Sequence, residues 1–176
     1  MRFLLFLFFN IVCAEYLVIQ SESSIIYSGK HPMHIWSGAT KELTLEQACS
    51  KSPENVCRLD FKFPIMSLNS GNDNRDSNMI NTLNAFTYPN IIMVFDDFII
   101  REYNNELVNA SIEIHGKIQD ISVPINLTIT DSGNYYVISD FSIFLSHYGI
   151  ELPTLLLMPI DDEIKINAEI LIRKSN

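Results

Sequence analysis

The sequence predicts an all-β protein, an eight-stranded antiparallel β-barrel with one short helix. Three observations support this fold class: apolar and polar residues alternate in several long runs, turn-forming residues separate these runs, and one segment has helical spacing. Alternation with a period of two gives a strand one apolar and one hydrated face, which is typical of antiparallel sheets. Because an open sheet of such strands would leave its edges unpaired, we expect the sheet to close on itself, with a β-sandwich as the alternative.

The alternating runs locate the strands along the chain. From Leu59 to Ile65, for example, every second residue is apolar. Residues 131–134 are typical of a hairpin loop, residues 119–120 of a tight connection, and Pro124 of an edge, a bulge or a barrel rim. The expected strands are Ser24–Gly29, His34–Leu43, Val56–Ile65, Ile91–Ile99, Glu106–Lys117, Ile121–Asp131, Tyr135–Leu145 and Glu163–Arg173, with Tyr16–Gln20 as an additional N-terminal strand.

One segment departs from the β pattern and predicts the helix. Its apolar residues lie three and four positions apart, as in an amphipathic helix: Met79, Ile80, Leu83 and Phe86. Asp76 or Ser77 can cap its start, and Pro89 limits its end. We therefore expect a short helix over Ser77–Ala85, lying across an end or a flank of the barrel.

The first 14 residues predict a secretory signal peptide. Arg2 supplies a basic end, Phe3–Val12 is almost wholly apolar, and small residues before the expected cleavage site end at Ala14. The apolar run is shorter than the ~20 residues of a spanning helix, which disfavours an uncleaved membrane anchor. Cys13 leaves lipidation as a weaker alternative, because no lipobox precedes it. We expect an exported domain of residues 15–176, in the periplasm or secreted.

The net charge and the cysteines disfavour two further classes of function, nucleic-acid binding and metal binding by the cysteines. A net charge of −9 disfavours binding to nucleic acid phosphates. Cys49 and Cys57 remain after cleavage, and such a pair usually forms a disulfide in an oxidising compartment. A metal site would need further ligands nearby, which the local sequence lacks. The expected disulfide fixes residues 50–55 where a strand begins.

No catalytic motif stands out in the sequence. It has no nucleophile elbow, zinc-protease motif or phosphate-binding glycine loop. Asp96 and Asp97 are adjacent on a strand, so their side chains point to opposite faces. No carboxylate cluster accompanies the histidines, which are His31, His34, His115 and His147. We therefore expect no enzymatic activity, no cofactor and no metal site.

The most specific pattern lies in the middle of the chain. Residues 70–77 read SGNDNRDS, and Tyr88-Pro89 follows the expected helix. This resembles the signature of the YceI-like family, and residues 31–38, 114–116 and 146–150 agree more weakly. The resemblance covers nearly all of residues 15–176. It implies a lipocalin-like barrel, a periplasmic or secreted location, and binding of long apolar or amphiphilic molecules such as polyisoprenoids or fatty-acid derivatives.

The chain also departs from the family pattern. Asn78 stands where many members have a histidine, and the Cys49/Cys57 pair is not a general family feature. The polar loop lacks the glycine and glutamate of a calcium-binding loop, so we expect it to have a structural role. In that role Asp76 would cap the helix and Arg75 would pair with a carboxylate or with loop carbonyls. The residues of this structural loop are Asn72, Asn74, Arg75 and Asp76.

Together these observations predict an exported lipid-binding protein that holds one apolar chain in the barrel lumen, for transport or storage. The expected pocket residues are Tyr27, Phe61, Phe63, Met79, Leu83, Phe86, Ile91, Met93, Phe95, Ile125, Leu127, Phe141, Ile143 and Leu156. Without the resemblance, these side chains are equally well explained as ordinary core. The alternative is an exported interaction or structural module whose barrel is filled by its own side chains.

Two features bear on partners. In the alternative, Ile92, Val94, Ile138 and Phe144 would form an exposed apolar strip, for instance the seam of a homodimer. Residues 151–159 are strongly apolar, lie between strands and must pack against something. We expect this segment and the helix to border the pocket opening, although the segment could instead close the barrel bottom. Transient contact with membranes is left open.

Overall fold

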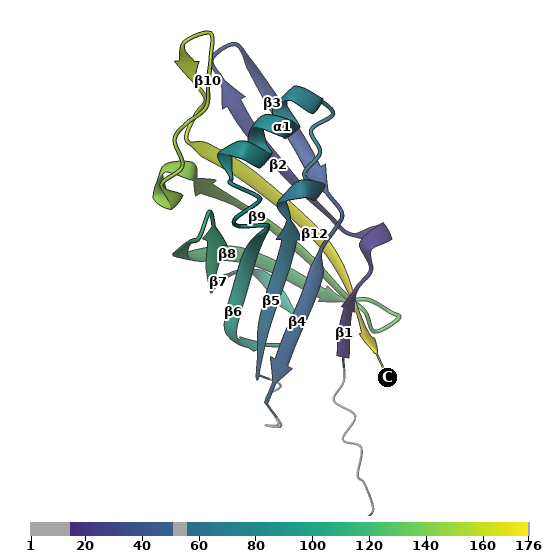
Figure 1. The fold of residues 1–176 in the computed structure, drawn as a ribbon. Helices are drawn as coiled ribbons and strands as arrows, with labels where there is room; N and C mark the ends of the chain where they lie inside the picture. The colour runs from purple at the N-terminus through teal and green to yellow at the C-terminus, as the bar shows by residue number, and fades with distance from the viewer. Residues whose placement is uncertain (1–14, 51–55, 176) are drawn as a thin grey trace, which may run out of the picture.

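The computed structural model describes residues 15–50 and 56–175. The predicted signal peptide, residues 1–14, and residues 51–55 lie outside the described residues. Most of the described chain forms one strongly curled antiparallel sheet, with a single α-helix across its upper end (Figure 1). No helix of the described residues is long and apolar enough to span a bilayer.

The main sheet has 10 strands. They are β1 (Glu15–Val18), β2 (Ser24–His31), β3 (His34–Thr40), β4 (Thr44–Cys49), β5 (Val56–Pro64), β6 (Asn90–Ile99), β7 (Tyr103–Ile114), β8 (Lys117–Ile129), β9 (Tyr135–Phe144) and β12 (Glu163–Ser175). Their order is β3-β2-β12-β9-β8-β7-β6-β5-β4, and β1 pairs with β12. The other elements are α1 (Asp73–Thr82), the hairpin of β10 (Thr154–Leu155) and β11 (Met158–Pro159), and the 3-10 turns η1 (Gln20–Glu22), η2 (Ile65–Ser67) and η3 (Leu145–Tyr148).

The curled sheet forms a half-barrel with a seam between β3 and β4, which do not pair along the described chain. Ala39 of β3 instead exchanges two backbone hydrogen bonds with Asn69, at 2.8 and 3.0 Å. Farther along the seam, β1 lies beside β4, and the Gln20 side chain donates to the carbonyl of Leu43 at 3.3 Å. The predicted all-β, barrel-type fold with one helix is confirmed, with a bridged seam in place of full closure.

Two strand predictions need correction. The expected strand His34–Leu43 ends at Thr40, and residues 44–49 form β4, which was not predicted. Alternation is weak in β4 because Gln47 occupies a half-buried position between Leu45 and Cys49. Pairing with β5 stabilises this strand despite its poor pattern.

The tight connection expected at residues 119–120 was also wrong. The β7–β8 hairpin turns at His115 and Gly116, whose φ angles are 54° and 71°. Positive φ at both central residues is the geometry of the tight turns that suit twisted hairpins. His115 fits the alternation of the preceding strand, which hid the turn in the sequence.

The helix begins and ends earlier than expected. Asn72, rather than Asp76 or Ser77, is its N-cap, and its side chain accepts a hydrogen bond from the Arg75 amide at 3.0 Å. The helix ends at Thr82, and Asn84 adopts a left-handed conformation with φ of 49°. Short polar side chains are favoured at the cap, and the sequence offered several of them in succession.

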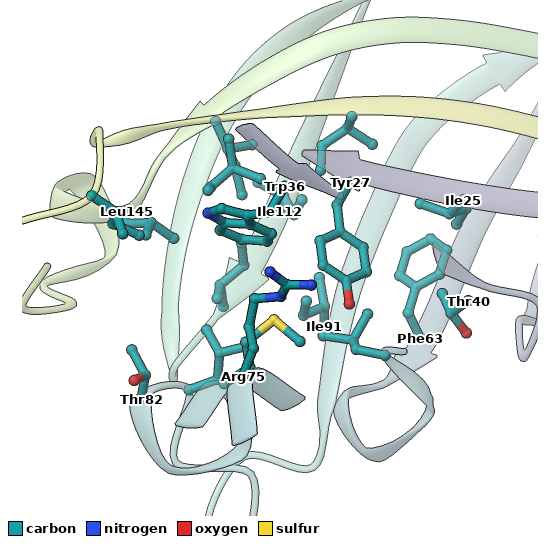
Figure 2. A pocket seen from close by; sticks show the side chains of 18 of the residues that line it. Ile25, Tyr27, Trp36, Thr40, Phe63, Arg75, Thr82, Ile91, Ile112 and Leu145 are labelled. Atoms are coloured by element: carbon teal, nitrogen blue, oxygen red, sulfur yellow. The ribbon is translucent and has the colours of Figure 1, made fainter. Parts of the chain in front are cut away.

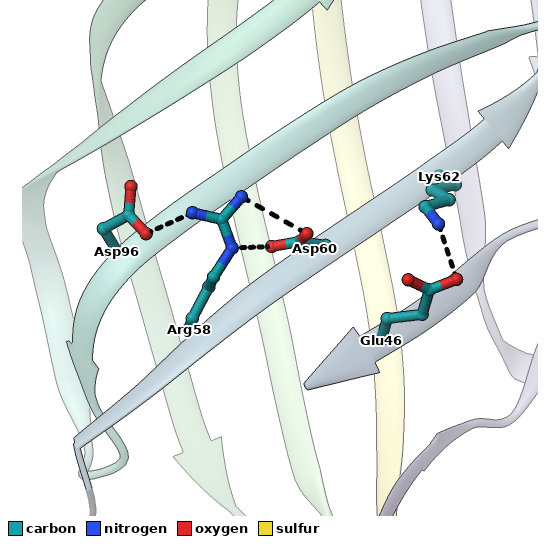
Figure 3. Close-up of polar contacts among 5 residues, drawn as sticks. All are labelled: Glu46, Arg58, Asp60, Lys62 and Asp96. Carbon is teal, nitrogen blue, oxygen red and sulfur yellow. Dashed lines mark hydrogen bonds and ion pairs between the residues drawn. The ribbon is translucent and has the colours of Figure 1, made fainter. Parts of the chain in front are cut away.

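Outside the half-barrel, charged side chains pair within β5 and from β5 to its neighbours β4 and β6 (Figure 3). Arg58 contacts Asp60 at 2.9 Å and Asp96 at 2.6 Å, and Lys62 contacts Glu46 at 2.5 Å. Exposed ion pairs of this kind contribute little to stability, about 0–1 kcal/mol each. They identify the hydrated face of these strands and therefore the opposite face as the interior.

The predicted disulfide is confirmed. Cys49 and Cys57 lie directly opposite each other in the β4–β5 register and are bonded. Val56 begins β5, Cys57 follows it, and Pro64 ends the strand, so the disulfide lies at the end of β5 away from α1.

The disulfide should stabilise the fold. Replacing both cysteines, as Cys49→Ala/Cys57→Ala, should lower the free energy of unfolding by about 2–3 kcal/mol, because a short covalent loop restricts the unfolded chain. Urea denaturation with and without reductant measures this. The reduced parent should match the double variant, and an unchanged midpoint after reduction would contradict the prediction.

Candidate functional site

A cavity of about 560 Å³ lies inside the half-barrel. Its walls are the inner faces of β2, β5, β6, β7, β9 and β12, together with Trp36 and Thr40 of β3. One face of α1 and residues of the segment 153–160 border it. Most lining side chains are aliphatic or aromatic, because alternation turns the apolar set of each strand inward (Figure 2).

An aromatic cluster fills the end of the half-barrel that lies away from α1. Phe61 and Phe95 meet edge to face at 6.1 Å, and Phe98 continues the cluster to Tyr103, whose ring it stacks on at 5.1 Å. Phe61 and Phe95 line the cavity, whereas Phe98 and Tyr103 do not. The cavity therefore ends at this cluster, and the interior beyond it is packed with side chains.

The structure brings most of the predicted pocket residues together. The lining includes Tyr27, Phe61, Phe63, Met79, Leu83, Ile91, Met93, Phe95, Phe141 and Ile143. Ile125 and Leu127 are buried but belong to the packed end, where Leu127 pairs with Tyr103 across the β7–β8 ladder. Phe86 is 83% exposed because the helix ends before it. Leu156 is exposed at the β10–β11 turn, and its neighbour Leu155 lines the cavity instead.

Several lining residues were missed by sequence reasoning. Trp36, His31 and His34 lie on or beside β3, whose sequence has no clear alternation. Alternation did predict that Ile112 and Ile114 face inward, but it does not give the position of a residue along the barrel axis. The same applies to the lining residues of β12, which are Ile164, Ile166, Ala168 and Ile170.

A group of hydrogen bonds that we call the Ser70 cluster, formed by Ser70, Arg75 and Asp76, fixes the start of α1. The Asp76 carboxylate accepts from the Ser70 amide at 3.0 Å and from its hydroxyl. Arg75 donates from Nε to the Ser70 hydroxyl at 2.8 Å and from Nη2 to the Ser70 carbonyl at 3.0 Å. Asp76 therefore ties the loop to the first helical turn rather than capping the helix.

Arg75 and Tyr27 introduce polar groups into the apolar cavity. The Arg75 guanidinium lies over the Trp36 ring, 5.4 Å from its centroid, and the side chain of Tyr27 stands beside it (Figure 2). Tyr27 is 6% exposed. Burial raises the pKa of Tyr27 to about 12, and the Asp76 carboxylate also raises it whereas Arg75 opposes this. The phenol is therefore neutral at physiological pH.

Beside the cavity, His31 joins two hairpin ends. Its Nε2 lies 3.2 Å from the carbonyl oxygen of Leu155, and its Nδ1 accepts from the Met33 amide at 3.3 Å. These contacts fit the tautomer with the proton on Nε2. They attach the β10–β11 hairpin to the end of β2 and β3. Within the described chain, no group of three or more His, Cys, Asp or Glu side chains could hold a metal ion.

Comparison with known proteins identifies the family. The model of the YceI-like domain matches residues 16–172. The chain belongs to the YceI-like family. The resemblance carried by residues 70–77 is thereby confirmed for a YceI-like domain that spans nearly all of the described chain. No curated protein matches the sequence.

Solved structures share the fold of this YceI-like chain at low sequence identity. BcnA from Burkholderia cenocepacia has 16% identity and a TM-score of 0.73, over 89% of this chain and 99% of that one. A polyisoprenoid-binding domain from Saccharophagus degradans, implicated in plant cell wall breakdown, has 15% identity and a TM-score of 0.75, over 93% and 100%. The YCEI protein of Campylobacter jejuni has 18% identity and a TM-score of 0.57, over 79% and 84%.

The Ser70 cluster should contribute measurably to stability. Asp76→Asn removes a charged acceptor of two hydrogen bonds, and we expect it to lower the free energy of unfolding by about 1–2 kcal/mol. Asp73→Asn is the matched control, because it removes the same charge from the same helical turn at an exposed position. Urea unfolding followed by far-ultraviolet circular dichroism measures both, and equal losses would mean that only the helix dipole is involved.

Proposed function

We propose that this YceI-like protein is an exported carrier or store for one long apolar or amphiphilic lipid, held in the half-barrel cavity. The observation that carries the proposal is the apolar cavity of about 560 Å³, a volume within the usual range of ligand pockets. Burying about ten methylenes would contribute roughly 8 kcal/mol before the costs of association. No side chain of the lining needs to react with such a ligand.

Membership of the YceI-like family and the likeness to a polyisoprenoid-binding domain support the ligand class. The disulfide supports an oxidising compartment, in agreement with the signal peptide expected at residues 1–14. We place the protein in the periplasm or outside the cell, with residues 15–176 as its functional domain.

The alternative, an interaction module with a filled barrel, is less well supported. Side chains fill only the end beyond the aromatic cluster, and the other end has room for a ligand. Of the apolar strip proposed for a homodimer, Ile92, Val94 and Ile138 are half-buried, and Phe144 is the one exposed member. The strip therefore offers little free apolar surface for a second copy.

The ligand itself can be identified directly. Protein purified without denaturant should release a long-chain lipid on organic extraction, detected by mass spectrometry. The delipidated protein should take up an added polyprenol or fatty amide and change the fluorescence of Trp36, the single tryptophan, which lines the cavity. Consistent absence of extracted lipid together with no uptake would contradict the proposed function.

A charge placed at the cavity wall should weaken uptake. Met79→Asp puts a carboxylate among apolar lining residues, and we expect roughly tenfold weaker lipid binding because the bound chain would desolvate it. Met66→Asp is the control, since Met66 is exposed and lies outside the lining. Fluorescence titration compares the variants after circular dichroism has shown native sheet content, and equal affinities would exclude α1 from the binding site.

We also propose that the ligand is exchanged with membranes at the end of the molecule where the β2–β3 and β10–β11 hairpins meet. This exchange tip consists of Met33, Ile35, Leu156 and Leu157, all exposed. Leu157 is 98% exposed, and Leu156 and Leu157 both have positive φ, at 52° and 65°. Positive φ is a left-handed backbone conformation that favours Asn or Gly over leucine. Two exposed leucines that adopt it support the proposal that the tip contacts an apolar phase, namely the bilayer. Leu155, next to the tip, lines the cavity.

This exchange tip can be tested separately from the cavity. Leu156→Asp/Leu157→Asp should slow lipid transfer from zwitterionic vesicles by roughly tenfold, since the lost leucines no longer enter the bilayer. Binding of a dispersed lipid at equilibrium should not change. Leu107→Asp alters an equally exposed leucine on β7 and should leave transfer intact. If the tip variant and this control transfer lipid at the same rate, exchange takes place elsewhere.

A further inference from the structure

The Tyr27 hydroxyl is a buried polar group that lacks a partner. Its oxygen makes no hydrogen bond within the described part of the chain, although the residue is nearly inaccessible to solvent. Buried hydroxyls in folded proteins are nearly always hydrogen-bonded, so an unpartnered one requires an explanation. Tyr27 also lines the cavity, where a bound molecule can reach it.

The position of this hydroxyl is built into the sheet. Tyr27 pairs with Gly38 in the β2–β3 register, and a Cβ atom at Gly38 would lie 2.2 Å from the Tyr27 oxygen. The glycine thus leaves the space that the phenol occupies. The Trp36 ring, also on β3, meets the Tyr27 ring edge to face at 6.2 Å.

Arg75 brings a second donor to the same region from α1. Its Nε and Nη2 are engaged by Ser70, whereas Nη1 makes no hydrogen bond to the described residues. Arg75 is the one Lys, Arg, Asp or Glu residue among the described residues of the lining. The influence of Arg75 on the pKa of Tyr27 is consistent with their proximity in Figure 2.

Under physiological conditions Arg75 can only donate, and the neutral phenol of Tyr27 can donate as well as accept. A guanidinium has no acceptor, and a phenol that remains neutral offers its proton most readily. Their natural partner is therefore an oxygen acceptor, and a cationic head would be repelled by Arg75. The three asparagines that line the cavity beside them, Asn72, Asn74 and Asn78, can add further hydrogen bonds.

We propose that Tyr27 and Arg75 form a head-group site and that the ligand is an amphiphile whose head presents a carboxylate or carbonyl oxygen. This inference rests on the proposed lipid-binding function and specifies the ligand class for the same cavity. The head lies beneath α1, and the tail extends toward Phe61 and Phe95 at the packed end. Ligands with one tail but different heads then bind with different affinities.

The test uses the delipidated full-length protein and four ligands of equal tail length: myristate, myristamide, myristylamine and tetradecane. Displacement of a polarity-sensitive dye gives their affinities. Myristate and myristamide should bind more tightly than the amine and the alkane. Tyr27→Phe should weaken myristate and myristamide by roughly threefold to tenfold, the usual effect of one hydrogen bond, and leave tetradecane unchanged.

Tyr148→Phe is the matched control. Tyr148 is another buried tyrosine, and burial raises its pKa to about 12, but it lies outside the cavity lining. It should leave all four affinities as in the parent protein. In the ligand-free protein, Tyr27→Phe should not lower the melting temperature, because the hydroxyl it removes has no partner in the protein.

The outcomes separate this inference from the proposed function. If tetradecane binds and Tyr27→Phe changes no affinity, or all affinities equally, the head-group site is overturned while the apolar cavity remains a lipid site. A fall in the melting temperature of ligand-free Tyr27→Phe would also overturn it, since the hydroxyl would then serve the fold. If the parent protein binds none of the four ligands, both proposals fail.

Discussion

The two backbone hydrogen bonds between Ala39 and Asn69 are the constraint on which the cavity depends. They cross the seam and attach the chain after β5 to the free edge of β3. Because Asn69 precedes Ser70, the same bridge fixes the Ser70 cluster, and this cluster orients the first turn of α1. Arg75 is thereby held over Trp36, which lies three residues before Ala39 on β3. A helix over the seam and a charge inside an apolar cavity both follow from one short backbone pairing.

The local pattern was sufficient to predict the fold class, but not every boundary. Alternation identified β5 and β12 because one face of each strand meets water and the other meets the apolar interior. It missed β4, where Gln47 interrupts the apolar set and long-range pairing supplies the stability. The helix start was wrong because Asn72, Asp73 and Asp76 can all cap, and only the tertiary position of Ser70 decides between them. Long-range contacts outweigh local propensity at these places.

The candidate site shows a different limit of sequence reasoning. Alternation places Leu127 and Ile114 equally inside the sheet, yet the first packs in the closed end and the second lines the cavity. The division follows from the aromatic rings of Phe98 and Tyr103, which fill one end because of their volume. The position of a residue along the barrel axis depends on the strand register, and turns and bulges elsewhere in the chain determine that register. The sequence likewise does not predict that the Tyr27 hydroxyl lacks a partner, because an inward-facing tyrosine is expected to be an ordinary core residue.

The seam has a consequence for the exposed edge of the sheet. An unpaired edge strand ordinarily recruits strands from other chains, which leads to aggregation. Here β4 is short, its outward Glu46 is paired with Lys62, and its last residue is covalently bound to β5. On the other side of the gap, Asn69 occupies part of the edge of β3. The ion pair, the disulfide and the backbone pairing with Asn69 make both edges poor templates for strand addition. The half-barrel can therefore keep an open seam beside an apolar interior.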